Sequence, residues 1–251
     1  MIQLSALGAL LQRGVRGGFY YFSTMNTVLN WSSGKDAAMA YHLLSGNESY
    51  YVSHLLTTIN AEQERIFMHG IRESLLEAQA QRMGLPLKKV KLPAHPDDSL
   101  YKNAMLETLQ QLKEEGVQAA AFGDIFLEDL KAYREAQLQQ LDIAPVFPLW
   151  KKDTRELVQL VAATGIEAKI VCVDAQKLGR EFIGRKIDAS LLNDLPANVD
   201  PCGENGEFHT FVYNAPFFSS PIPIVEGEVV YKEYKTEENS WGFYFLDLCL
   251  L

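Results

Sequence analysis

The sequence is poor in cysteine and in basic residues. Its three cysteines in 251 residues, Cys172, Cys202 and Cys249, lie far apart and form no CxxC pair. This excludes a disulfide scaffold and a zinc knuckle, and it favours a reducing cytoplasm. The 23 Lys and Arg residues against 32 Asp and Glu residues give a net charge of −9. A uniformly basic surface for nucleic acid is therefore not expected.

The amino terminus carries no apolar run long enough for a membrane span. The run Leu4–Leu11 is cut short by Gln12-Arg13-Gly14, whereas a span needs about 20 apolar residues. No cationic segment precedes the run, so it is a poor signal peptide. We expect no membrane attachment, and we predict that residues 1–24 form a disordered extension or result from an upstream start codon. A transit peptide is the alternative.

The remaining composition, with 47% apolar residues, 17 Gly and 10 Pro, is ordinary for a globular protein and excludes collagen, coiled coil and bulk disorder. Apolar stretches typical of buried strands alternate with segments of helical periodicity. This alternation predicts an α/β fold with a parallel sheet covered by helices on both faces. The predicted strands are 28–31, 50–59, 88–92, 117–122 and 170–173, and the predicted helices are 37–44, 65–83, about 101–116, 126–141 and one that begins after a capping box at Asp153 and Glu156.

The texture changes after about Lys177. Residues 207–213 are typical of a strand, and 227–234 with 241–248 are typical of a hairpin. We therefore divide the chain into a nucleotide-binding domain over residues 25–176 and a smaller, mixed α+β lobe over residues 177–251. Nucleotide binding is assigned to the first domain because of its segment at residues 32–36.

The segment Ser32-Ser33-Gly34-Lys35-Asp36 ends the first buried strand and opens a helix. Backbone N–H groups and the helix dipole make such a turn an anion site, and Gly34 lets the backbone approach closely. Lys35 would add a charge and Asp36 would hold Mg²⁺. The segment lacks the first glycine of the P-loop NTPase motif. A plain strand–turn–helix is the alternative for these five residues alone.

Residues Ser32 to Ala37 resemble the Ser-Gly-Gly-x-Asp-Ser loop of the N-type ATP pyrophosphatases, the PP-loop superfamily. In that superfamily ATP is cleaved to AMP and pyrophosphate while an acid or amide is adenylated. Here Ser33 replaces a glycine and Ala37 replaces the closing hydroxyl residue. We expect Ser33 to fit the loop only with a negative φ. Ala37 removes one potential phosphate donor, which puts full activity in doubt.

A second motif spans Asp200 to Thr210 and places Glu204 and Glu207 three residues apart among glycines. Such acids can bind a cationic substrate, orient ammonia or hold a metal, and an acidic, solvated turn is the alternative. Glu204-Asn205-Gly206-Glu207-Phe208 resembles the Glu-Gly-Gly-Glu-Phe signature of the diphthine–ammonia ligase family. The similarity runs from about Met25 to Pro221, and further family motifs match at residues 69–70, 122–125 and 148–151.

The resemblance implies a HUP-like α/β domain and an enzyme that uses ATP and ammonia to amidate diphthine on elongation factor 2. No glutaminase-like segment surrounds Cys202, so free ammonia is the expected nitrogen source. We assign catalysis to Lys35, Asp36, Glu204 and Glu207, with Mg²⁺ at Asp36. The nucleotide would be bound by Ser32, Ser33, Gly34, Lys35, Asp36, His69, Gly123 and Asp124, and the acid substrate by Trp150, Lys151, Gly203, Gly206 and His209.

Asn205 in place of a glycine and His209 in place of an acid look more like the bacterial branch of the family. Bacteria are not expected to make diphthamide, so a different acid is an alternative substrate. Another is a nucleotide-binding regulatory protein that has lost catalysis; modification of transfer RNA is disfavoured by the −9 charge. We further predict that Glu204 and Glu207 face a cleft opposite Ser32–Asp36, with Gly123-Asp124 between them.

Overall fold

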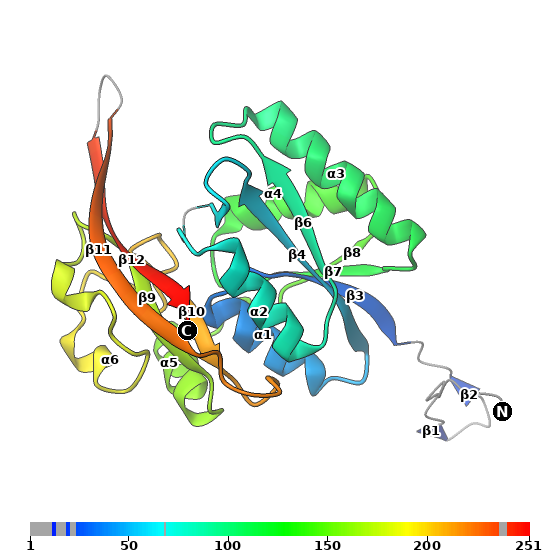
Figure 1. The fold of residues 1–251 in the computed structure, drawn as a ribbon. Coiled ribbons are helices and arrows are strands. Elements are labelled where there is room, and N and C mark those ends of the chain that lie inside the picture. Colours follow the sequence, from blue (N-terminus) through cyan, green and yellow to red (C-terminus); the bar gives the residue numbers. More distant parts are fainter. Residues whose placement is uncertain (1–11, 14–18, 21–23, 68, 236–239) are drawn as a thin grey trace.

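The computed structural model describes residues 12–13, 19–20, 24–67, 69–235 and 240–251 (Figure 1). Most of the segment 1–24, for which we predicted an extension, lies outside the described residues. Within it β1 (Gln12–Arg13) and β2 (Phe19–Tyr20) pair antiparallel. None of the described helices is both long and apolar enough to cross a membrane.

The first sheet has five parallel strands in the spatial order β6-β4-β3-β7-β8. They are β3 (Met25–Asn30), β4 (Tyr50–Asn60), β6 (Leu87–Leu92), β7 (Ala119–Ala121) and β8 (Ala144–Val146), and a short β5 (Arg65–Ile66) pairs antiparallel with the end of β4. Counted along the chain, the parallel strands have the order 3-2-1-4-5. The direction of winding reverses between β3 and β7, the point at which open α/β sheets bind ligands.

Helices cover both faces of this sheet, as predicted (Figure 1). α1 (Lys35–Ser45) and α2 (Glu73–Met83) cover one face, and α3 (Asp98–Glu114) and α4 (Glu128–Gln139) cover the other. Successive residues of a strand point to opposite faces. Accordingly Leu29 packs in the core with Leu75 of α2, while its neighbour Val28 packs in a second core with Leu109 of α3. Buried apolar strands therefore hold two helical layers together.

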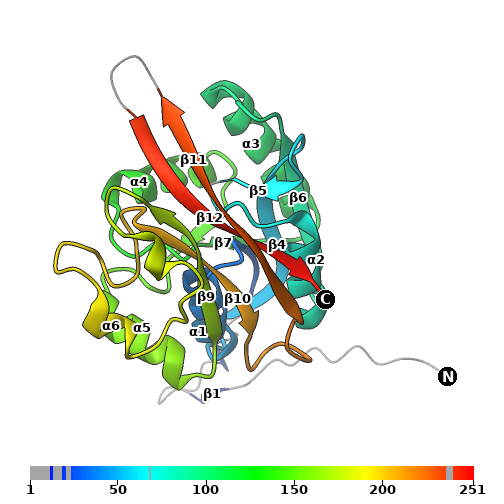
Figure 2. The same ribbon diagram turned by 60° about the vertical axis from the view of Figure 1, so that its left-hand side comes forward.

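The carboxyl-terminal lobe is built on an antiparallel sheet of order β10-β9-β12-β11. Its strands are β9 (Glu167–Asp174), β10 (Phe208–Asn214), β11 (Ile224–Lys235) and β12 (Ser240–Leu250), with α5 (Thr154–Ala163), a 3-10 turn (Arg180–Phe182) and α6 (Leu191–Asp194) around them. Figure 2 shows the long β11–β12 hairpin crossing the face of the molecule. The predicted fold class, an α/β HUP-like domain with a smaller α+β lobe, is confirmed.

Two predicted elements differ from the structure. The strand at 170–173 pairs with β10 and β12 and does not extend the parallel sheet, because a short buried apolar run fits either kind of sheet. The helix predicted over 65–83 begins only at Glu73. Residues 65–66 form β5. The loop that follows contains Gly70 with φ +68°, a left-handed conformation that cannot be part of an α-helix, so the helix begins only after it. The capping interaction at Asp153 is present, since its carboxylate accepts a hydrogen bond of 2.9 Å from the Glu156 N–H.

Candidate functional site

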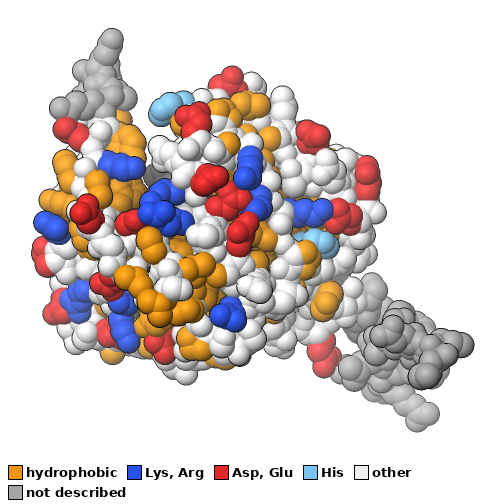
Figure 3. Space-filling model, in the orientation of Figure 1, with side chains coloured by type: hydrophobic (Ala, Val, Ile, Leu, Met, Phe, Trp, Pro, Cys, Tyr) orange, Lys and Arg blue, Asp and Glu red, His pale blue; other side chains and the backbone are white. Residues whose placement is uncertain are grey.

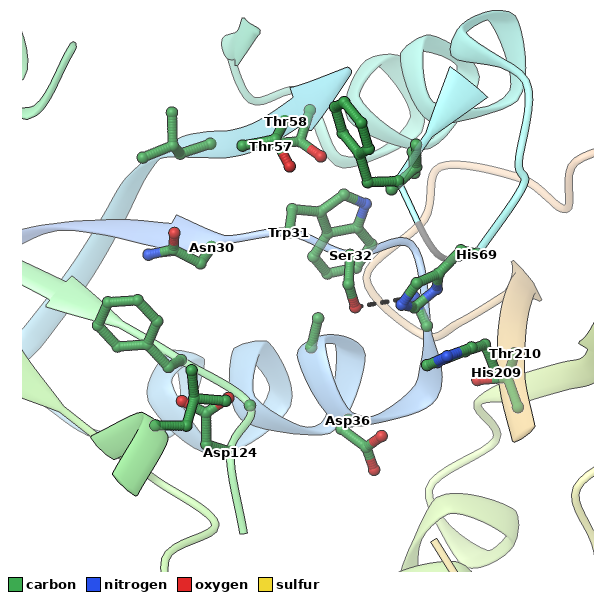
Figure 4. Close-up of a pocket in the computed structure, with 18 of the residues that line it drawn as sticks. Asn30, Trp31, Ser32, Asp36, Thr57, Thr58, His69, Asp124, His209 and Thr210 are labelled. Atoms are coloured by element: carbon green, nitrogen blue, oxygen red, sulfur yellow. Dashed lines mark hydrogen bonds between the residues drawn. The ribbon is translucent and has the colours of Figure 1, made fainter. Parts of the chain in front are cut away.

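A cavity of about 760 Å³ lies at the reversal point between β3 and β7, where the two lobes meet. We call it the first cavity. Its walls include the loop after β3, the ends of β4 and β7 and the loop before α2 (Figure 4). The turn before β10 forms a further wall. Ten predicted site residues line it: Ser32, Gly34, Lys35, Asp36, His69, Gly123, Asp124, Gly203, Glu204 and His209. The structure thus brings together two motifs that are about 170 residues apart in the sequence.

Ser33 does not have the negative φ that we expected. Its φ is +70°, and its side chain is fully buried with a hydroxyl that has no hydrogen-bond partner among the described residues. A non-glycine residue in this region is strained by roughly 1–3 kcal/mol. The Ser33 carbonyl accepts hydrogen bonds from Val212 N (3.0 Å) and from Gln79 Nε2 (3.1 Å). These bonds from β10 and α2 hold the loop in the conformation that glycine would adopt freely.

Two glycines fit the site through close packing. A Cβ at Gly34 would lie 3.2 Å from the Thr210 carbonyl oxygen, and a Cβ at Gly123 would lie 2.9 Å from the carbonyl carbon of Asp36. Gly34 has an extended conformation, with φ −92°. Its missing side chain makes room for β10, from which Thr210 Oγ1 accepts a hydrogen bond of 3.0 Å from Lys35 N. The absence of a side chain at both glycines therefore allows neighbouring segments to pack closely at the start of α1.

The Lys35 ammonium is buried inside the site, with only 2% of the side chain exposed. It donates to Asp36 Oδ2 at 2.8 Å and to Asp36 Oδ1 at 3.0 Å, and it also donates to the Cys202 carbonyl. Burial, the largest influence, lowers the pKa of Lys35, but the charge of Asp36 and the hydrogen bond to it prevail, so that the pKa is raised. The ammonium joins residues 32–36, which we call the predicted anion loop, to the turn that carries Glu204.

Three carboxyl groups face the first cavity, and the pKa of each is raised by burial. For Asp36 the nearby Lys35 opposes the shift, and for Asp124 the Arg134 guanidinium of α4 does so, its Nε lying 2.6 Å from Oδ2. The pKa of Glu204 rises to about 7. Hydrogen bonds from Ile125 N (2.7 Å) and Phe126 N (3.4 Å) to its Oε1 partly offset the burial. The charges of Asp36 and Asp124 also raise the pKa of Glu204, so a cation bound near these carboxyl groups is favoured.

The residues present fit Mg²⁺ only together with a phosphate ligand. Within the described part of the chain, no group of three or more His, Cys, Asp and Glu side chains is arranged to hold a metal ion. Mg²⁺ that binds through nucleotide phosphates needs just one or two protein carboxylates. Asp36, in the first turn of α1 and 28% exposed, is placed to supply one.

His69 and His209 stack on each other in the wall of the first cavity, with ring centroids 4.4 Å apart and an interplanar angle of 28° (Figure 4). Burial lowers the pKa of His69 well below its ordinary value, and it lowers the pKa of His209 to about 4. The Lys35 charge adds to both shifts. Both imidazoles are therefore neutral at neutral pH and can accept a hydrogen bond.

Five predicted site residues do not line the first cavity: Ser33, Trp150, Lys151, Gly206 and Glu207. Glu207 is 1% exposed, and its Oε1 accepts hydrogen bonds from Asp200 N (3.2 Å) and Asn205 Nδ2 (3.1 Å), so it holds the turn together. Trp150 packs against Phe147, with ring centroids 5.9 Å apart. Lys151 pairs with Glu128 on the surface.

Other lining residues were not predicted from the sequence. Asn30, Thr57 and Thr58 lie toward the carboxyl ends of β3 and β4, so the strand-end rule would have found them. Arg134 gives no such signal, because it lies within a helix and reaches Asp124 only through the fold. Cys202 is a buried thiol whose pKa is raised by burial, and its Sγ lies 3.4 Å from the Thr154 carbonyl.

Comparison with known proteins extends over both lobes. The family model of the diphthamide synthase N-terminal domain matches residues 25–142, and that of the C-terminal domain matches residues 153–247. The diphthine–ammonia ligases of Bos taurus and Homo sapiens are 25% and 24% identical over 220 residues, which cover 79% of this chain and 82% of each relative. The ligase of Schizosaccharomyces pombe is 28% identical over 149 residues, 57% of this chain but only 21% of that much longer relative. The chain belongs to the diphthine–ammonia ligase family.

Proposed function

We propose that the protein is an ATP-dependent ligase that amidates a carboxylate with ammonia. The acid's carboxylate oxygen attacks the α-phosphorus of ATP, which forms an acyl-adenylate and releases pyrophosphate. Ammonia then attacks the acyl carbon and displaces AMP, losing one proton as the amide forms. The relatives named diphthine–ammonia ligase support this reaction class.

The observation that carries the proposal is the position of Glu204. Its carboxyl group, with a pKa of about 7, lies in the same cavity as the anion loop and the start of α1. An acyl-adenylate must be reached by a nitrogen nucleophile, and Glu204 with Asp36 can attract ammonium to that cavity. Holding reactants side by side in this way can lower a barrier by roughly 7–11 kcal/mol at best.

The other groups have roles that follow from their contacts. The N-terminal N–H groups of α1, apart from that of Lys35, which already donates to Thr210 Oγ1, would bind phosphate oxygens, because a helix start leaves donors free and carries positive potential. Asp36 would hold Mg²⁺, which neutralises phosphate charge when bound. Glu204, whose pKa of about 7 lies near neutral pH, can take up the proton that leaves the nitrogen. Cys172, Cys202 and Cys249 are free thiols, which supports a cytoplasmic enzyme.

We propose diphthine on elongation factor 2 as the first acid to test, with a different acid as the alternative. The experiment incubates the protein with ATP, Mg²⁺, ammonium chloride and elongation factor 2 that carries diphthine. AMP, pyrophosphate and the mass of the modified peptide are measured. AMP formation that requires both the acid and ammonium supports the ligase.

A second function, nucleotide binding without ligation, is favoured by Ala37, which offers no hydroxyl, and by the strained Ser33. ATP or AMP binding with no pyrophosphate release, whatever acid is added with ammonium, would support it over the ligase.

A further inference from the structure

A second cavity of about 890 Å³ lies beside the first, between the β11–β12 hairpin and the segments around β5 and residues 94–95. Its volume is within the range of pockets that bind small molecules, and such pockets often lie between domains. The two cavities share four lining residues, Ile66, Phe67, Ala94 and His95. The two cavities therefore adjoin at these residues.

The hairpin wall of the second cavity is an aromatic strip. Tyr234 lies opposite Trp241, Lys232 opposite Phe243, and Val230 opposite Phe245 in the register of β11 and β12. Because alternate residues of a strand share a face, these six side chains form one continuous surface toward the cavity. Tyr234 and Phe243 have ring centroids 6.0 Å apart, and Phe243 and Phe245 have centroids 6.1 Å apart. Figure 3 shows hydrophobic side chains along the hairpin, next to the hollow between the lobes.

Part of this strip is exposed to solvent. Val230, Tyr234 and Trp241 are all among the exposed large apolar side chains. Apolar side chains gathered in this way mark binding surfaces more often than scattered ones do. The neighbouring charges are already compensated at one end, where the Asp247 carboxylate pairs with Arg65 at 2.8 Å and with Arg72 at 2.6 Å. The aromatic faces of the strip, with Lys232 and Glu228 beside them, remain for recognition.

We infer that the second cavity binds the body of the acid substrate, and that this acid has a flat aromatic or extended apolar body. The body stacks on the strip of Tyr234, Trp241, Phe243 and Phe245. Its carboxylate passes Phe67 and His95 and reaches the α-phosphate in the first cavity. This inference rests on the proposed ligase function for the reaction, but not for the binding.

The chain offers a matched pair of variants for the test. Tyr234 and Tyr231 are both on β11 and have exposed fractions of 47% and 52%. Tyr234 lines the second cavity, whereas Tyr231 lies on the opposite face of the hairpin, where its ring is 5.1 Å from that of Tyr244. If substitution of Tyr234 weakens binding and substitution of Tyr231 does not, the effect comes from the cavity and not from the loss of an exposed aromatic side chain.

The binding experiment uses 2-naphthylacetate and its neutral amide with the full chain, without ATP, by calorimetry and tryptophan fluorescence. We expect saturable binding of naphthylacetate that changes Trp241 fluorescence, a signal lost in Trp241→Phe. Tyr234→Ala and Phe243→Ala should each weaken binding about tenfold, as expected when an aromatic stacking partner is lost, while Tyr231→Ala should change it less than twofold. Saturating ATP should leave the affinity unchanged. Absence of saturable binding, competition with ATP, or equal effects of Tyr231→Ala and Tyr234→Ala would overturn the inference.

The turnover experiment separates this inference from the proposed function. If Tyr234→Ala weakens binding but no acid supports AMP formation, the cavity assignment holds and the ligase proposal fails. If elongation factor 2 with diphthine is amidated with the same KM by Tyr234→Ala and by the unchanged protein, the ligase proposal holds and the cavity assignment is wrong.

Discussion

The Glu204 carboxylate accepts a hydrogen bond of 2.7 Å from the backbone N–H of Ile125, so an acid of the carboxyl-terminal lobe is fixed on the loop that follows β7. This bond spans 79 residues of sequence and orients Glu204 into the first cavity. Its neighbour in the motif, Glu207, is buried behind the turn. Two acids of the same motif therefore have different surroundings.

Exchange of these two acids for their amides should have different consequences. Glu204→Gln should reduce AMP formation at least about 100-fold, the lower range for loss of an acid–base group, and leave ATP affinity nearly unchanged. Glu207→Gln should mainly lower thermal stability, because the Glu207 carboxylate holds Asp200 and Asn205. AMP release measures the turnover of both variants, calorimetry measures their ATP affinity, and thermal unfolding measures their stability. Equal loss of turnover without loss of stability in both variants would contradict this division of roles.

The stability of the protein should respond to pH at Glu204 and His209 with opposite signs. The pKa of Glu204 is about 7 in the fold, against an ordinary 4.5, so its contribution to stability increases as the pH falls from about 7 toward 4.5. The pKa of His209 is about 4 in the fold, against 6.5, so its contribution is lost as the pH falls from 6.5 to about 4. Urea unfolding across this window should show more loss toward acid in Glu204→Gln and less in His209→Gln than in the unchanged protein.

Ser33→Gly should stabilise the protein by about 1 kcal/mol. Glycine adopts the φ of +70° without strain, and the buried Ser33 hydroxyl has no partner to lose among the described residues. The carbonyl bonds from Val212 and Gln79 do not depend on the side chain. Urea unfolding checks the sign, and a loss of stability would mean that the hydroxyl makes a contact in solution.

The sequence was sufficient for the order of the parallel strands and the helices between them, because apolar periodicity and turn residues mark most of their boundaries. It placed the strand at 170–173 in the wrong sheet, since a run such as Ile170–Val173 is buried in either sheet. It predicted the anion loop and Glu204 as site residues, because their residue types and spacing indicate their chemistry. It could not separate Glu204 from Glu207, or find Arg134 and the Tyr234 strip, because these depend on which segments the fold brings together.

Lys35→Met should show whether the buried ammonium serves the fold or the nucleotide. The methionine keeps the volume but leaves Asp36 and the Cys202 carbonyl without their donor. Loss of one partner of a buried pair costs roughly 3–5 kcal/mol, and the partial exposure of Asp36 places this case at or below the lower value. Lys35→Met/Asp36→Asn should recover part of that loss. Comparison of the ATP affinity of the double variant with that of Asp36→Asn alone then reports the phosphate contribution of Lys35, and equal affinities would remove Lys35 from the nucleotide site.

Gly123→Ala should damage the nucleotide site through packing alone. The added Cβ would lie 2.9 Å from the Asp36 carbonyl carbon and 3.0 Å from Ala37 N, a backbone segment that cannot turn aside. Overpacking of this kind costs roughly 1–3 kcal/mol and displaces the start of α1, whose N–H groups we assign to phosphate. Gly46→Ala is the matched control, because Gly46 ends the same helix with φ −88° and its Cβ would meet nothing closer than 3.8 Å. We expect calorimetry to show weaker ATP binding in Gly123→Ala only. If both variants bind ATP like the unchanged protein, the start of α1 does not hold the nucleotide.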